Sequence, residues 1–294
     1  MSGANDNTPL SGAATGLLLS GAARVAGVIG WPVAHSRSPR LHGHWLRTYG
    51  VDGAYVPLAV APGTAERAIR ALPALGFAGA NVTVPHKEIA ARVCDELTDQ
   101  ARRIGAVNTL IVDHGRLVGD TTDGFGFLEN LRQHRPDWRA AAGPAVVLGA
   151  GGSARAVCAA LLDAGVPEIR LLNRTVNKAE AVADALGGPI RCAPLSESGR
   201  AMMDAALLVN TTVLGMQGQP PLDLNLDSLP AGAEVTDLVY APLETSLLAA
   251  ARERGNPVVD GLGMLLHQAR PGFKAWFGVD PEVTDALRRV VLDG

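Results

Sequence analysis

The chain has 294 residues, of which 47% are hydrophobic and 19% are charged, with a formal net charge of −3. This length accommodates two domains, and the absence of a basic run longer than two residues argues against nucleic-acid binding. No apolar stretch reaches the roughly 20 residues that a membrane-spanning helix needs.

The three cysteines, Cys94, Cys158 and Cys192, are odd in number and widely spaced, and no CxxC pair occurs. This pattern argues against a disulfide framework or a zinc site. It fits a reducing compartment, so we expect a cytoplasmic protein. Residues 1–23, rich in Gly, Ala and Ser, are predicted to form a flexible tail.

Residues 24–97 alternate between β-branched runs and helical patterns, which indicates a mostly parallel α/β sheet. Thr64 is the predicted N-cap of the second helix. Two apolar runs then flank Asp113–Gly115 and predict a hairpin. The predicted strands cover 24–30, 53–60 and 79–85, and the predicted helices cover 40–50, 63–76 and 86–97.

A second α/β unit begins near Ala141, where residues 144–175 read as strand, glycine-rich turn, helix and strand. Later apolar runs predict further strands, with a helix between the last two of them. From Leu262 onward the pattern is helical. The later strands are predicted at 204–212, 234–240 and 257–261, and the helix at 244–255.

The segment "VVLGAGGSA" places Gly149, Gly151 and Gly152 directly between a β-branched strand and a helix. Such glycines permit a tight turn, and the free N–H groups of the helix suit a pyrophosphate. The spacing departs from G-x-G-x-x-G, with Ala154 at the third small position. The alternative is a glycine-rich turn that binds no ligand.

The next strand ends in "NRT", where an NAD site would usually carry an acidic residue. Arg174 and Lys178 would instead attract a 2′-phosphate, and Thr175 is positioned to cap the following helix. We therefore predict NADP as the cofactor. The alternative for Arg174 is a solvated charge on a loop.

"NVTVPHKE" places Lys87 just past the end of a strand, at the edge where α/β proteins bind ligands. His35–Ser38 follow the first strand at the same edge. A lysine beside Asp123 would form a proton donor and acceptor pair for alcohol–ketone interconversion. The alternatives are a solvated lysine at a helix start and an ordinary turn aspartate. For His35, His86 and His267 we favour structural hydrogen bonding over general acid catalysis.

The chain resembles the shikimate dehydrogenase family from about Val25 to Trp276. The motifs that carry the resemblance occur in family order: "GWPVAHSRSPRLH", "NVTVPHK", "GAVNT", "TDGFG", "LGAGGSARA", "NRT", "VNTTVLGM", "DLVYAPLETSLLAAARERG" and "GLGMLLHQA". The resemblance implies NADPH-dependent, reversible reduction of 3-dehydroshikimate to shikimate, a step in chorismate and aromatic amino-acid biosynthesis. It implies a small-molecule substrate and a monomer or homodimer.

The resemblance places Lys87 at the reacting oxygen, paired with Asp123, which also binds the ring hydroxyls. The matched substrate contacts are Ser36, Ser38, Thr83, Asn108, Tyr240 and Gln268. The matched cofactor contacts are Gly149, Ala150, Gly151, Gly152, Ser153, Asn173, Arg174, Thr175, Lys178, Leu238 and Gly261. Asp99 matches a weaker family contact, which we do not assign.

Because Gln268 matches a substrate residue, the C-terminal helices should return to the first domain and enclose a cleft. We therefore predict a substrate domain at 24–124 and 262–294 and a Rossmann-like NADP domain at 125–261. Gly43 and Thr121 stand where many family members carry Asn. These departures leave open a quinate/shikimate dehydrogenase or a paralogue acting on a related cyclohexene acid. A methylenetetrahydrofolate dehydrogenase and a non-catalytic NADP sensor are less favoured.

Overall fold

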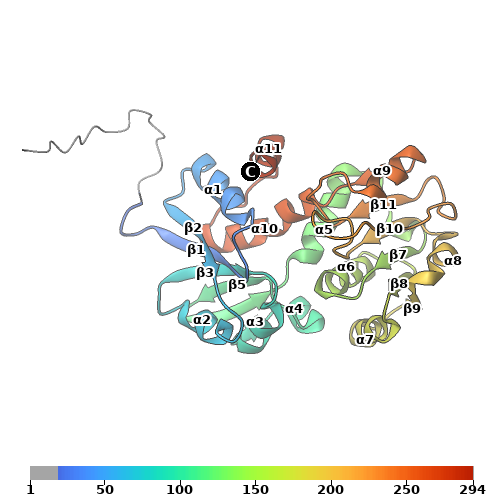
Figure 1. The fold of residues 1–294 in the computed structure, drawn as a ribbon. Helices are drawn as coiled ribbons and strands as arrows, with labels where there is room; N and C mark the ends of the chain where they lie inside the picture. The colour runs from blue at the N-terminus through green and yellow to red at the C-terminus, as the bar shows by residue number, and fades with distance from the viewer. Residues whose placement is uncertain (1–18, 294) are drawn as a thin grey trace, which may run out of the picture.

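The computed structural model describes residues 19–293, so most of the tail predicted for residues 1–23 lies outside the described residues. The chain forms two lobes, each built on a six-stranded sheet with helices packed against it (Figure 1). The predicted two-part α/β fold is confirmed.

The first lobe consists of the sheet formed by β1 to β6 and the helices that cover it. Its strand order is β2-β1-β3-β5-β6-β4. β1 is parallel to β2 and β3, and β4 is parallel to β6, whereas β5 is antiparallel to both of its neighbours. The strands are β1 (Arg24–Gly30), β2 (Gly53–Ala59), β3 (Phe77–Val82), β4 (Glu96–Leu97), β5 (Thr109–Asp113) and β6 (Arg116–Asp120).

The predicted hairpin is present between β5 and β6. Asp113 pairs with Arg116, which leaves His114 and Gly115 in the turn with φ angles of 47° and 80°. A two-residue turn of this kind requires positive φ at both positions. Gly115 adopts that conformation without cost.

Several helices of the first lobe differ from their predicted bounds. Its helices are α1 (Ser38–Thr48), α2 (Ala65–Ala71), α3 (Lys87–Val93), α4 (Asp99–Ile104) and α11 (Asp285–Leu292). α2 ends ahead of Pro73, which cannot donate to a helix and clashes with the preceding turn. Glu96–Leu97, predicted as helix, pair with β6 instead. Thr64 is the N-cap residue of α2 as predicted, but its hydroxyl donates to the Ala61 carbonyl at 2.7 Å and makes no capping bond.

The second lobe has a fully parallel sheet with the strand order β12-β11-β10-β7-β8-β9. The chain reverses its direction of travel across the sheet between β7 and β10, and such a switch point opens a ligand crevice. The strands are β7 (Ala145–Leu148), β8 (Ile169–Asn173), β9 (Ile190–Pro194), β10 (Leu207–Asn210), β11 (Glu234–Asp237) and β12 (Val258–Val259). The helices are α6 (Gly152–Asp163), α7 (Val176–Leu186), α8 (Ser198–Met202), α9 (Ser246–Glu253), and the 3₁₀ helices η1 (Ala140–Ala142) and η2 (Leu195–Glu197).

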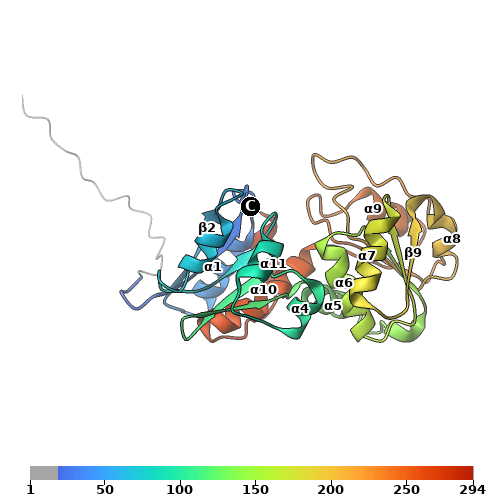
Figure 2. The ribbon, with the colours of Figure 1, turned by 90° about the horizontal axis from the view of Figure 1, so that it is seen from below.

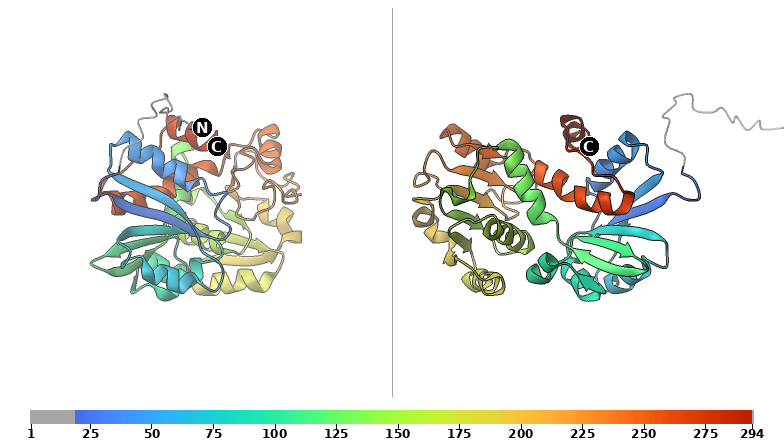
Figure 3. Two further views of the ribbon diagram at one scale, coloured as in Figure 1. Left: turned by 60° about the vertical axis from the view of Figure 1, so that its left-hand side comes forward. Right: turned by 180° about the vertical axis from the view of Figure 1, so that it is seen from behind.

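Two helices, α5 (Asp123–His134) and α10 (Leu262–Phe277), pack against each other at the junction of the lobes (Figures 2 and 3). α10 leaves the second lobe and ends in the core of the first. There the indole N–H of Trp276 donates to the Leu110 carbonyl at 2.9 Å. The predicted return of the C-terminal helices is therefore confirmed. The predicted boundary after residue 124 falls inside α5.

A buried carboxylate lies where β11 begins, next to the end of α5. The Glu234 side chain is 5% exposed, and its Oε2 accepts a hydrogen bond from Arg135 Nη1 at 2.6 Å. Its other oxygen has no partner within residues 19–293. Burial raises the pKa of Glu234 from 4.5 to about 7, and Arg135 offsets part of this effect.

This raised pKa predicts a pH-dependent stability. Protonated Glu234 contributes stability that is complete below about pH 4.5 and is lost as the pH rises through 7. Glu234→Gln should match the wild type near pH 4.5 and exceed its free energy of unfolding by about 1–3 kcal/mol at pH 8. Urea denaturation across this range, with the exposed Glu253→Gln as control, measures the difference. Parallel curves for Glu234→Gln and wild type would contradict the assignment.

Candidate active site

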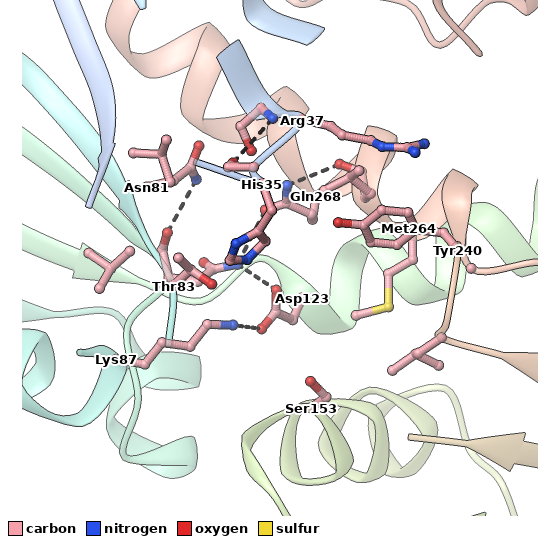
Figure 4. Close-up of a pocket in the computed structure, with 18 of the residues that line it drawn as sticks. His35, Arg37, Asn81, Thr83, Lys87, Asp123, Ser153, Tyr240, Met264 and Gln268 are labelled. Carbon is pink, nitrogen blue, oxygen red and sulfur yellow. Dashed lines mark hydrogen bonds and ion pairs between the residues drawn. The ribbon is translucent and has the colours of Figure 1, made fainter. Parts of the chain in front are cut away.

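A cavity of about 230 Å³ opens between the two lobes (Figure 4). It is bounded by the carboxyl ends of β1 and β3, the start of α6, the loop after β11 and the start of α10. The lining residues are Val28, Val33, His35, Ser36, Arg37, Ser38, Asn81, Val82, Thr83, Lys87, Asn108, Asp123, Ser153, Leu238, Tyr240, Gly261, Met264, Leu265 and Gln268.

Lys87 and Asp123 meet at one side of this cavity. Lys87 is the first residue of α3 and Asp123 the first residue of α5, and Nζ lies 2.5 Å from Oδ2. The side chains are 23% and 12% exposed, so both reach the cavity while remaining partly shielded from water. Asp123 Oδ1 also accepts from Asn108 Nδ2 at 2.7 Å. The carboxylate is thus held by two donors, and it orients the ammonium group towards the cavity (Figure 4).

Asn108 connects this pair to the two junction helices. Its Nδ2 group donates to Thr122 Oγ1 and lies 3.4 Å from Gln268 Oε1. Its Oδ1 accepts from the Thr122 backbone N–H at 2.9 Å. Thr122 Oγ1 donates in turn to the Gln268 carbonyl at 2.8 Å. The amide of Asn108 therefore connects the start of α5 to the middle of α10. Thr122 mediates this connection, and the sequence did not indicate that role.

Ser36, Ser38 and Thr83 line the cavity from the first lobe. Ser36 Oγ accepts from the Ser38 backbone N–H at 3.3 Å, at the start of α1. Thr83 follows β3 and closely approaches Gly30, where an added Cβ would lie 2.4 Å from Thr83 Cγ2. Gly30 therefore allows the ends of β1 and β3 to come together.

A buried polar wall supports the cavity from behind. The Tyr55 hydroxyl donates to Asn81 Oδ1 at 2.6 Å, and Asn81 Nδ2 donates to the Asn108 carbonyl at 3.2 Å. The His42 ring stacks on Tyr55 at 3.9 Å, and burial lowers its pKa to about 3, so it stays neutral. Asn81 was not assigned from the sequence. The sequence feature that could have identified it is a polar amide side chain at the end of an otherwise apolar strand.

Tyr240 and Leu238 reach the cavity from the loop that follows β11. The buried Asp237 fixes this loop, because its carboxylate accepts from Asn210 Nδ2 at 2.9 Å, the Val239 N–H at 3.0 Å and the Thr245 hydroxyl at 2.8 Å. Burial raises the pKa of Asp237, and the three donors offset part of this. The pKa of Tyr240 is also raised by burial, and the positive charge of Arg37 offsets part of this rise.

The glycine-rich turn lies at the switch point of the second lobe. Gly149 has a φ of 105°, and an added Cβ would lie 2.8 Å from Thr211 Oγ1, so a side chain is not tolerated there. A Cβ on Gly151 or Gly152 would meet nothing within 4 Å. This open space at the N-terminus of α6 fits a pyrophosphate. Ala150 belongs to the same turn, and Ser153 faces the cavity from α6.

The second group of predicted cofactor residues follows β8. Arg174 and Lys178 are exposed, and neither forms an ion pair with another described residue. Asn173 Nδ2 donates to the Thr175 carbonyl at 2.8 Å and shapes the turn. Thr175 occupies the predicted N-cap position of α7, but its hydroxyl makes no capping bond. These residues do not line the central cavity. Two unpaired cations at the end of β8 suit a 2′-phosphate.

The remaining candidates separate into structural and cavity-lining residues. His86 Nε2 contacts the Val60 carbonyl at 2.7 Å, and His267 Nε2 contacts Gln133 Oε1 at 2.7 Å, so both make structural hydrogen bonds. His35, for which the same was expected, lines the cavity instead. Asp99 pairs with Arg102 on an exposed face of α4, away from the cavity lining.

The chain is similar to known proteins over most of its length. A shikimate dehydrogenase (NADP(+)) from Rhodospirillum rubrum is 68% identical over 280 residues, which are 94% of this chain and 99% of that protein. The chain belongs to the shikimate dehydrogenase family. Three family models agree: shikimate dehydrogenase substrate binding domain at 28–110, shikimate / quinate 5-dehydrogenase at 133–214, and shikimate 5'-dehydrogenase C-terminal domain at 261–292.

Solved structures of the family share the fold. A shikimate 5-dehydrogenase from Thermus thermophilus, in complex with NADP(H) and shikimate, has a TM-score of 0.82 and 36% identity, over 92% of this chain and 99% of that one. A quinate dehydrogenase from Corynebacterium glutamicum, in complex with NAD, has a TM-score of 0.86 and 29% identity, over 92% and 99%. Within the described residues, no helix has the length and apolar character to span a bilayer.

The three donors around Asp237 predict that an amide cannot replace it. Asp237→Asn turns one accepting oxygen into a donor that faces another donor in a buried site. We expect the free energy of unfolding to fall by about 1–3 kcal/mol. Urea denaturation measures this, with Asp227→Asn, whose side chain is 83% exposed, as the matched control. Equal losses in the two variants would show that the Asp237 network does not hold the loop.

Proposed function

We propose that the protein catalyses the NADP-dependent, reversible reduction of 3-dehydroshikimate to shikimate, with Lys87 and Asp123 at the reacting centre. The observation that carries this proposal is the Lys87–Asp123 pair, 2.5 Å apart, in a cavity that both lobes line. Family membership supports the NADP-dependent oxidoreductase activity. The contacts of the individual side chains support the roles that follow.

The cavity offers groups that match each part of the substrate. The hydroxyls of Ser36 and Ser38 suit the carboxylate. Thr83 and Tyr240 present further hydroxyls to the same space. Amide and carboxylate groups of Asn108, Asp123 and Gln268 can each exchange hydrogen bonds with ring hydroxyls. A polyhydroxylated anion therefore finds a partner for each polar group.

Lys87 acts on the reacting carbonyl oxygen. Asp123 holds the ammonium group in place through the contact of its Oδ2 with Lys87 Nζ. As the carbonyl is reduced, negative charge develops on its oxygen, and a preoriented ammonium stabilises that charge and is the nearest donor of the required proton. In the oxidative direction the neutral amine of Lys87 accepts the proton from the hydroxyl. Asn108 keeps the Asp123 carboxylate from rotating away.

The second lobe contains a fitting place for the cofactor. NADPH, when bound, supplies the hydride. The pyrophosphate belongs at the turn of Gly149, Ala150, Gly151, Gly152 and Ser153, beside the free N–H groups of α6. Asn173, Arg174, Thr175 and Lys178 surround the position of the ribose phosphate. Leu238 and Gly261 line the shared cavity and are assigned to the nicotinamide end.

This assignment divides the chain into a substrate domain at 24–124 and 262–294 and an NADP domain at 125–261, with α5 crossing the boundary. A cytoplasmic location accords with three cysteines that form no disulfide in the described chain. The predicted assembly stays a monomer or a homodimer. The cations Arg174 and Lys178 argue against an NAD-linked quinate dehydrogenase as the alternative.

Removal of the Lys87 ammonium tests the reaction centre. We expect Lys87→Ala to lower kcat for shikimate oxidation by about 10²–10⁴-fold, because the developing charge loses its donor. The KM for NADP should change little, because Lys87 does not belong to the cofactor turn. Steady-state kinetics measures both, with the exposed Lys274→Ala as the matched control. Retention of more than a tenth of the wild-type kcat would exclude the proposed role.

Removal of the cations after β8 tests cofactor choice. We expect Arg174→Gln and Lys178→Gln each to reduce the ratio of kcat/KM for NADP to that for NAD by about 10–100-fold, through loss of a charge-assisted contact. The control is Arg200→Gln, which changes an exposed arginine in α8 that is not among the predicted cofactor residues. An unchanged ratio in both variants would place the 2′-phosphate elsewhere.

A further inference from the structure

The charges in the cavity leave one cation without a partner. Asp123 is the single carboxylate among the lining residues, and Lys87 and Asn108 occupy its two oxygens. The Lys87–Asp123 pair is therefore close to neutral overall. Arg37 also lines the cavity and carries a further positive charge. A substrate with one carboxylate would bring the charge that balances it.

One nitrogen of the Arg37 guanidinium lacks an acceptor among the described residues. Its Nη1 atom is buried and has no hydrogen-bond partner within residues 19–293. A buried guanidinium nitrogen without an acceptor costs free energy unless a ligand provides one. In the sequence, Arg37 lies between Ser36 and Ser38 as the residue before α1, and all three line the same cavity.

Tyr240 holds the guanidinium from the other lobe. The Arg37 guanidinium carbon lies 5.6 Å from the centre of the Tyr240 ring, within the range of a cation–π contact (Figure 4). Arginine suits this place better than lysine, because its planar group can stack on a ring and still donate to a carboxylate in a fork. The contact also crosses the cleft, since Arg37 precedes α1 and Tyr240 follows β11.

We propose that Arg37 is a specificity-determining residue that pairs with the carboxylate of the substrate, while Tyr240 keeps its guanidinium in place. This inference rests on the proposed function, because it takes a cyclic hydroxy acid as the substrate. The serine hydroxyls would then orient the carboxylate, and Arg37 would favour a negatively charged substrate over a neutral one.

The test compares shikimate with its neutral methyl ester in the wild type and in Arg37→Gln. We expect kcat/KM for shikimate to fall by about 10–100-fold in the variant, and kcat/KM for the ester to change less than about threefold. The KM for NADP should stay unchanged. Arg37→Lys should recover part of the loss and should show a steeper dependence on salt, because it restores charge without the stacked fork. Arg40→Gln, an exposed arginine on the first turn of α1, is the matched control.

The outcomes distinguish the pairing of Arg37 with the carboxylate from the proposed reaction itself. An equal loss for acid and ester in Arg37→Gln, or no loss for either, overturns the pairing with the carboxylate and leaves the reaction standing. A rise in the KM for NADP would assign Arg37 to a cofactor phosphate and would also overturn it. If the wild type fails to oxidise shikimate, the proposed function falls first and the inference falls with it.

Discussion

The ion pair between Lys87 and Asp123 is the contact on which the account of this site depends. It joins the first residue of α3 to the first residue of α5, so it lies where the first lobe meets the junction helices. A lysine at a helix start would ordinarily extend into water. Here the carboxylate keeps its ammonium group at the cavity, and Asn108 fixes the carboxylate in turn.

The junction helices explain why this geometry persists. α5 and α10 pack on each other, and Asn108 reaches both through Thr122 and Gln268. Trp276 then anchors the far end of α10 in the first lobe. The substrate side of the cavity is therefore one connected unit. The second lobe contributes the turn before α6 and the loop that Asp237 holds, and this loop brings Tyr240 to the same cavity.

Local sequence patterns were sufficient for the parts of the site that follow from the backbone alone. A strand that ends in "VTVPHK" places Lys87 at a ligand-binding edge, and a glycine turn between strand and helix places the N-terminus of α6. Contacts between distant residues were not accessible in this way. Chemistry alone suggested a Lys87–Asp123 pair but left both residues open to ordinary explanations, because 36 positions separate them. The family resemblance then supported the pairing.

The incorrect sequence predictions also arise from contacts between residues that are distant in the sequence. Glu96–Leu97 continue a helical pattern, but a strand partner in β6 decides their conformation. Thr64 and Thr175 occupy cap positions, yet neither hydroxyl makes the capping bond. No individual role was predicted for Asn81 or Arg37, because their contacts involve Tyr55 and Tyr240, which lie far away in the sequence.

The position of the substrate relative to Lys87 can be measured in a crystal structure of the complex with shikimate and NADP⁺. We expect Lys87 Nζ to lie about 2.6–3.2 Å from the hydroxyl that becomes the ketone, with the nicotinamide on the far side of the ring carbon. A structure in which that hydroxyl contacts another side chain, and the Lys87–Asp123 pair stays clear of the substrate, would contradict it.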